Sequence, residues 1–155
     1  MEPHRRPEDD PGWAFYPQTV IHLRRGRCRA RIDCRRAVDA AVLRDLAALG
    51  LPGAFRVLTA CHPGGEALGP AEDRRRTARL ARRLRSRGLR PIRADGGSPD
   101  GRHLEAGWAV PLPAAAARAL AEADGQSAIF HFDGCRMWIE PVLVDADPIP
   151  LPADG

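Results

Sequence analysis

Apolar and polar side chains alternate along much of the chain in a way that predicts short β-strands. Residues 19–23 are apolar and β-branched, and residues 27–33 alternate arginine or acid with small or apolar residues, so the two segments are expected to pair as a hairpin. The most apolar segment is 54–61, which predicts a central strand. Further strands are predicted at 89–94, 105–112, 126–132 and 136–144, the last two being joined at Asp133-Gly134.

Three segments instead repeat their apolar residues at intervals of three and four, which predicts amphipathic helices. They are 38–49, 70–86 and 113–125, and the second begins with Pro70 followed by two acids, which suits a helix N-terminus. The resulting order, ββαβαββαββ, predicts a single-domain α+β fold. We expect an α/β sandwich with a mostly antiparallel sheet and about three helices.

The ends of the chain differ in composition from its centre. Residues 1–15 are expected to form a flexible, extended N-terminal arm, residues 16–144 the domain, and residues 145–155 an acidic, proline-rich tail. The polar N-terminus does not resemble a signal peptide, and no segment is apolar for long enough to span a membrane. We therefore expect a bacterial cytoplasmic protein whose four cysteines are reduced.

Composition excludes several chemistries. The 24 basic residues are all arginine, and the chain contains neither lysine nor asparagine. A phosphate-binding P-loop and a lysine Schiff base are therefore impossible. The net charge of +4 is a weak indication of a nucleic-acid partner, because arginine without lysine also follows from a GC-rich genome.

The segment 59–65 is the most informative candidate site. A buried strand ends there in a glycine-rich turn, and a helix begins shortly afterwards, which is an arrangement that often binds ligands. Glu105 and Gln126 begin separate strands and are candidates to approach this turn. The predicted ligand-binding residues are Thr59, Cys61, His62, Gly64, Gly65, Glu105 and Gln126. The alternatives are an ordinary tight connection at 59–65, and for Glu105 a surface position or a role as a helix-cap partner.

Catalysis and metal binding are two further kinds of chemistry that involve some of these residues. A catalytic role for Cys61 or His62 stays open, although neighbours on an extended segment point to opposite sides and make a poor nucleophile–base pair. Residues of the types that bind zinc are His62, His103, Glu105, His131 and Cys135. No two close ligand pairs occur among them, so neither a metal nor another cofactor is predicted.

The helix predicted at 70–86 suggests a different function. Residues 74–93 contain ten arginines and no acid, and Arg75, Arg79, Arg83 and Arg87 form one row. Like charges four residues apart repel, so the row predicts an anionic partner such as nucleic acid. The alternatives are that acids of the same chain cover the row, either those of the acidic tail or Asp9 and Asp10, or that the row is a solvated face.

Several motifs follow one another along the chain: a strand ending in Thr59-Ala60 with Pro63 after it, the pair Glu72-Asp73, Glu105, and Gly125-Gln126 before a final hairpin. Together they resemble the pattern of a family of bacterial proteins, the domain-of-unknown-function family 3293. Tyr16 to Thr19 resembles the family's opening strand, so the resemblance is expected to cover residues 16–143. His62 and Asp73 stand where the family has asparagine, so any site shaped by those asparagines has changed.

The resemblance implies a fold and a cytoplasmic location but no established activity. The sequence therefore predicts a small domain that binds a ligand or protein partner near 59–65. A nucleic-acid-binding module and a small enzyme are the alternatives.

Overall fold

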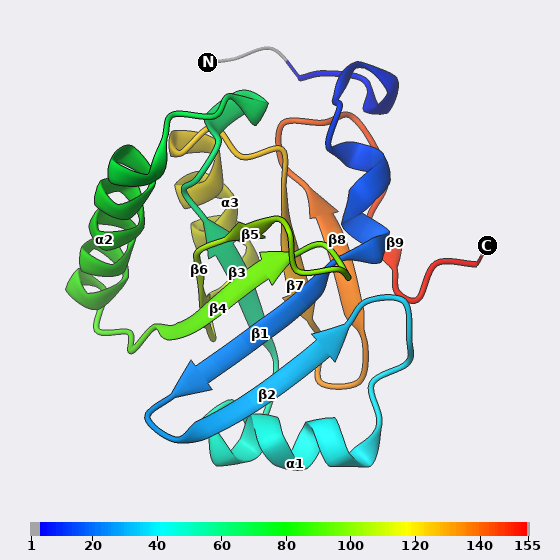
Figure 1. Ribbon diagram of the computed structural model, residues 1–155, viewed down its shortest axis with the longest axis vertical. Helices are drawn as coiled ribbons and strands as arrows, with labels where there is room; N and C mark the ends of the chain where they lie inside the picture. Colours follow the sequence, from blue (N-terminus) through cyan, green and yellow to red (C-terminus); the bar gives the residue numbers. More distant parts are fainter. Residues whose placement is uncertain (1–3, 155) are drawn as a thin grey trace.

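The computed structural model describes residues 4–154 and shows the predicted α+β fold, built around one curled sheet (Figure 1). Every pair of neighbouring strands is antiparallel, in the order β2-β1-β4-β6-β3-β7-β8-β9, with β5 also on β4. The strands are β1 (Val20–Arg25), β2 (Cys28–Asp33), β3 (Phe55–Thr59), β4 (Ile92–Gly97), β5 (Leu104–Glu105), β6 (Gly107–Val110), β7 (Ala128–Phe132), β8 (Met137–Pro141) and β9 (Ile149–Pro150).

The three predicted α-helices are confirmed. They are α1 (Ala40–Ala48), α2 (Pro70–Ser86) and α3 (Ala114–Ala123). The Asp39 side chain accepts a hydrogen bond from the Val42 amide and caps α1. Three short 3-10 helices complete the fold, η1 (Pro7–Asp9), η2 (Trp13–Gln18) and η3 (Pro63–Gly65). None of the helices between residues 4 and 154 is both long and apolar enough to cross a membrane.

The inner face of the curled sheet holds one hydrophobic core. Ile21 and Leu23 of β1 point into it, as do Phe55 and Val57 of β3, while α1 and the aromatic residues of η2 close its ends. Figure 1 shows why these strands meet: β1, β2 and β4 lie in front of β7 and β8, so their inner faces oppose each other. Apolar side chains from both halves of the sheet are thereby removed from water.

A second core lies on the outer face, but only over half of the sheet. There α2 and α3 pack on β3, β6 and β7, and the cluster includes Leu58, Leu80, Leu84 and Val110. Among the described residues, none from β2, β1 or β4 belongs to this cluster, so it leaves the outer face of these strands uncovered, and Figure 1 shows α2 beside them. Buried and exposed residues alternate along β2 from Arg29 onwards, as the pattern at 27–33 predicted, and along β1 from Ile21 to Arg24.

Long-range contacts change several predicted boundaries. The strand predicted at 89–94 is found at Ile92–Gly97, because Gly96 and Gly97 pair with β1 and extend the strand beyond its predicted end. The strand predicted at 105–112 is divided at Ala106 into β5 and β6.

The two chain ends also differ from the predicted conformation. Extended backbone is wrong for 7–9 and 13–18, which are 3-10 helices, and Arg5 bridges to Val144. In the tail, β9 pairs with β8. These pairings join residues far apart in the sequence, which local patterns do not reveal. The division into arm, domain and tail stays a prediction.

Candidate ligand-binding site

A pocket of about 690 Å³ opens at the end of the curled sheet, between η2 and the inner faces of the strands. Its walls come from η2, β1, β3, β4, β6 and β7 and from the loop after β4. The residues lining it are Gly12, Phe15, Tyr16, Gln18, Thr19, Ile21, Val57, Thr59, Ala94, Gly96, Gly97, Ser98, Pro99, Asp100, His103, Glu105, Gly107, Ala128 and Phe130. Binding cavities commonly have this volume and this mixture of apolar walls with a few polar groups.

Two residues of the predicted site line the pocket, Thr59 and Glu105. The Thr59 hydroxyl donates to the Ala106 carbonyl oxygen at 2.9 Å and accepts from the Cys61 amide at 3.1 Å. Thr59 thus holds together the end of β3 and the chain between β5 and β6. Glu105 Oε1 contacts His62 Nδ1 in a short hydrogen bond, and no described hydrogen bond within residues 4–154 uses its Oε2 atom.

His62 lies between two carboxylates. Besides Glu105 at Nδ1, Asp73 Oδ2 of α2 lies 3.7 Å from His62 Nε2. The backbone of His62 is left-handed, with φ 48° and ψ 56°, which costs a non-glycine residue roughly 1–3 kcal/mol. Asp73 Oδ1 is buried without a hydrogen-bond partner in the described part of the chain. The geometry makes His62 a support for the Glu105 carboxylate, linking it to the first turn of α2.

Gln126 and the two glycines of the turn lie behind this pair, outside the pocket lining. Gln126 Nε2 donates to the Cys61 carbonyl oxygen at 2.8 Å and to that of Asp124 at 3.2 Å. The Gly64 amide donates to the Gly125 carbonyl oxygen at 2.8 Å. These contacts attach the 59–65 turn to the segment between α3 and β7. Gly65 has φ 83°, a backbone conformation that favours glycine.

The Cys61 thiol is also outside the pocket lining. It is buried, with Sγ 3.7 Å from both Thr77 Oγ1 and the Ala106 carbonyl oxygen. Burial raises the pKa of this thiol, and the negative charges of Asp73 and Glu105 raise it further. A protonated thiol is a weak nucleophile, so these surroundings do not activate Cys61.

The aromatic end of the N-terminal segment forms a wall that the site prediction missed. Tyr16 packs at 5.7 Å from Trp13 and at 6.0 Å from Phe130, measured between ring centroids. Burial and the charges of Asp10 and Glu105 raise the pKa of the Tyr16 hydroxyl. Asp10 holds this segment in place, because its carboxylate accepts hydrogen bonds from the Ser127 hydroxyl and the Gly12 amide. The aromatic residues at 13–16 were the sequence signal for this wall.

The row of arginines on α2 has partners inside the protein at two of its four positions. Arg75 pairs with Glu72 at 2.5 Å and Arg83 with Asp124 at 3.3 Å, while no ion pair within residues 4–154 includes Arg79 or Arg87. Burial raises the pKa of the Asp124 carboxyl group, against the lowering effect of the nearby arginines. Two positions of the row therefore do not need an external anion.

The acidic tail does not supply those partners. The Asp145 amide donates to the Arg5 carbonyl oxygen, and β9 continues along β8. Figure 1 shows this part of the chain on the side of the molecule away from α2. Among the described residues, no ion pair joins the tail to α2. The alternative in which the tail covers the arginine row is therefore wrong.

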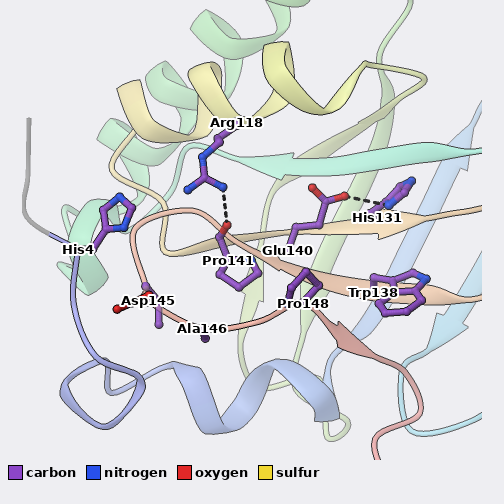
Figure 2. A pocket seen from close by; sticks show the side chains of 10 residues that line it. His4, Arg118, His131, Trp138, Glu140, Pro141, Asp145, Ala146 and Pro148 are labelled. Atoms are coloured by element: carbon purple, nitrogen blue, oxygen red, sulfur yellow. Dashed lines mark hydrogen bonds and ion pairs between the residues drawn. The ribbon is translucent and has the colours of Figure 1, made fainter.

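A second, smaller pocket of about 390 Å³ lies beside β8 (Figure 2). His131 Nδ1 lies 2.9 Å from Glu140 Oε1, and Arg56 lies 3.0 Å from the same oxygen. Burial and the Arg56 charge lower the pKa of His131.

His131 stands opposite Trp138, and Cys135 lies in the turn beyond Phe132, so the zinc-type residues of this hairpin do not converge. Nowhere in residues 4–154 do three His, Cys, Asp or Glu side chains form a metal-binding group.

Of the predicted site residues, then, Thr59 and Glu105 face the larger pocket, and His62 supports Glu105 from outside it. Cys61, Gly64, Gly65 and Gln126 build the turn next to it. Other residues that line the pocket were not predicted. They lie at inward-facing positions of β1, β4 and β7, and only the order of the strands in the sheet brings them together. The ligand-binding role of all these residues stays a prediction.

Comparison with known proteins agrees with the family motifs. No curated protein and no solved structure matches the chain. A family model matches residues 58–129, which include His62, Asp73 and Glu105 but are a shorter region than the 16–143 expected. His62 and Asp73, the two departures from the family pattern, lie against each other in the fold. Over residues 58–129 the chain resembles the family described as Protein of unknown function (DUF3293).

Proposed function

We propose that the protein binds a small, largely apolar molecule whose polar end donates hydrogen bonds or carries positive charge. The observation that supports this proposal is the composition of the larger pocket. Arginine is absent from its described lining, although the chain contains 24 arginines, and its acidic residues are Asp100 and Glu105. Such a pocket attracts cations and hydrogen-bond donors and repels anions.

The pocket entrance supports an apolar ligand. Phe15 lines it and is 68% exposed, and Leu104, next to the lining residue Glu105, is 56% exposed. Large apolar side chains that remain in water beside a cavity are typical of interaction sites. Covering them would remove apolar surface from water at roughly 25 cal/mol per Å².

Glu105 is the residue we expect to select the polar end of the ligand. Its Oε1 atom is engaged by His62, which fixes the orientation of the carboxylate, and its Oε2 atom is the one we assign to the ligand. Tyr16 adds a hydroxyl that stays protonated at neutral pH, because the pKa of that hydroxyl is raised. A neutral hydroxyl can donate and accept hydrogen bonds without adding charge.

The test compares three probes that share one ring system: indole, tryptamine and indole-3-propionate. Isothermal titration calorimetry of the full chain should show the order of affinity tryptamine, indole, indole-3-propionate. Glu105→Gln keeps the hydrogen bond to His62 possible but removes the negative charge, so it should reduce the preference for tryptamine over indole by about tenfold. Glu66→Gln, an exposed acid outside the pocket lining, is the control of equal charge and should keep the preference.

Tighter binding of the carboxylate probe would contradict the proposal, as would an equal effect of the two variants. If none of the three probes binds and native mass spectrometry of the purified chain shows no bound small molecule, the pocket is not a site of this kind.

The alternatives have less support. A protein partner could cover the same apolar entrance, but the volume of the pocket favours a small molecule. Catalysis by Cys61 is disfavoured because its thiol is protonated and lies outside the pocket. Nucleic-acid binding by the α2 row has less support because Arg75 and Arg83 already have acidic partners within the protein. The cytoplasmic location stays a prediction.

A further inference from the structure

The uncovered outer face of β2, β1 and β4 carries a row of arginines that crosses the strands. In the register of the sheet, Arg24 of β1 stands opposite Arg29 of β2 on one side and opposite Arg93 of β4 on the other. Arg93 in turn stands opposite Trp108 of β6, and its guanidinium lies 5.6 Å from the centre of the indole ring. We call Arg29, Arg24 and Arg93 the cross-strand row. Neighbouring members are separated by one strand spacing, about 4.8 Å.

Two arginines on this face have no acidic partner in the described chain. Arg93 pairs with Asp95 at 2.5 Å. Asp33 is bound by Arg35 at 2.8 Å and also lies 4.0 Å from Arg31, which shares this face. No ion pair within residues 4–154 includes Arg24 or Arg29, and both residues are exposed. Like charges directly opposite each other in a sheet are destabilising, so the row has an unmet preference for anions.

Helix α2 borders the same face with more arginines. Arg76 and Arg83 point towards Asp124 at the end of α3, as their hydrogen bonds show. Arg74 is about 200° from Arg76 around the helix, and Arg85 about 200° from Arg83, so both lie on the flank away from α3. Trp108 donates its indole N–H to the Thr77 carbonyl oxygen and thereby joins α2 to β6, next to the uncovered strands. Arg74 and Arg85 are exposed, and neither has an ion pair in the described chain.

We propose that this face, formed by the cross-strand row and the adjacent flank of α2, binds the phosphate backbone of double-stranded nucleic acid. Arginine binds phosphate oxygens through paired N–H groups. The phosphates of a nucleic-acid backbone form a row of negative charges, which complements the positive charges that extend in two directions over this surface. A duplex is favoured over a single strand because this face offers no open aromatic ring for base stacking. Its one aromatic residue, Trp108, is half-buried and covered by Arg93.

The test measures fluorescence anisotropy of a labelled 20-base-pair DNA duplex and of its separate 20-nucleotide strand, from 50 to 200 mM salt. The wild-type chain should bind the duplex more tightly, with an affinity that falls linearly with the logarithm of salt concentration. Arg24→Gln with Arg29→Gln should weaken duplex binding by tenfold or more at 50 mM salt. The same variant should also reduce the slope of log affinity against log salt concentration by roughly 1.8, which is about 0.9 for each lost phosphate contact.

Two matched double variants locate the effect. Arg36→Gln with Arg44→Gln removes the same charge from exposed positions elsewhere, and should change affinity by less than about twofold. Arg79→Gln with Arg87→Gln removes the unpaired members of the α2 row, and should also have a smaller effect than the Arg24 and Arg29 pair. Circular dichroism of each variant verifies that it remains folded.

Three results would overturn the proposal. The first is no duplex binding by the wild-type chain at 50 mM salt. The second is an equal loss in all three double variants, which would mean that net charge alone drives association. The third is tighter binding of the single strand, which would assign the surface to a different kind of nucleic acid.

Discussion

The two faces of strands β1 and β4 have opposite chemistry. On the inner face, Ile21 and Ala94 line an apolar pocket, and arginine is absent from the described lining. On the outer face, the exposed Arg24 stands opposite the half-buried Arg93. The two surfaces are separated only by the thickness of one sheet, because successive side chains of a strand point in opposite directions. One pair of strands can therefore present an apolar ligand site and a polyanion site back to back.

The largest effect is expected from a pair of substitutions at neighbouring positions of β1. Leu23→Ala, on the inner face, should lower the free energy of unfolding by about 2–5 kcal/mol, because it leaves a cavity in the core. Arg24→Ala should change it by no more than about 0.5 kcal/mol, and any change should be stabilising, because repulsion from Arg29 and Arg93 is relieved. Urea unfolding followed by circular dichroism measures both. Equal destabilisation by the two variants would contradict the contrast between the faces.

A smaller effect is expected at Gly107, where β6 lies between β3 and β4 beside the pocket. A Cβ atom there would lie 2.7 Å from the carbonyl oxygens of both Ala94 and Leu58, which belong to the backbone and cannot move aside separately. Gly107→Ala should therefore destabilise the fold by about 1–3 kcal/mol. Gly53→Ala is the matched control, since a Cβ atom there meets nothing within 4 Å. Thermal unfolding of both variants tests the prediction, and a Gly107 variant as stable as the control would show that the strands can separate.

The smallest effect is expected from an acid–arginine pair at the end of β2, and it should depend on pH. Hydrogen bonding to Arg35 lowers the pKa of Asp33 from 3.8 to about 2. Since the folded-state pKa is the lower one, this contribution is fully present above pH 4 and is lost as the pH falls towards 2. Asp33→Asn should therefore reduce stability at pH 6 and have progressively less effect between pH 4 and 2. A constant difference across that range would show that ionisation of Asp33 does not contribute.

Local patterns were enough to locate most elements of this fold. Pro70 and Pro113 at helix starts, and Gly50 and Gly88 after helix ends, are features of the chain within one turn of a boundary, which is why all three α-helices are found where predicted. Predictions failed where a partner far along the chain decides the conformation. Gly96 and Gly97 form strand because β1 and β5 supply their partners, and residues 149–150 because β8 does.

The candidate site was also predictable only in part. Residue types around 59–65 and at 105 indicated a polar site, and Thr59 and Glu105 do face a common pocket. His62 was expected on extended backbone, whereas its left-handed conformation turns the ring towards Glu105 and Asp73. Four of the seven predicted residues belong to the turn and its attachment, because a list of residue types does not say which side chains point into a cavity.

By itself, the sequence determined the chemistry of each face: the two-residue period of β1 and β2 separates Ile21 and Leu23 from Arg24 and Arg29 whatever the neighbouring strands are. It also excluded lysine chemistry, since the chain has no lysine. Only the tertiary structure decided which faces meet. Strand order brings β1, β3, β4 and β7 around one pocket, and it aligns three arginines from three strands in a row. The reason is physical: side-chain direction follows from the backbone of each strand alone, whereas strand pairing depends on the packing of segments distant in sequence.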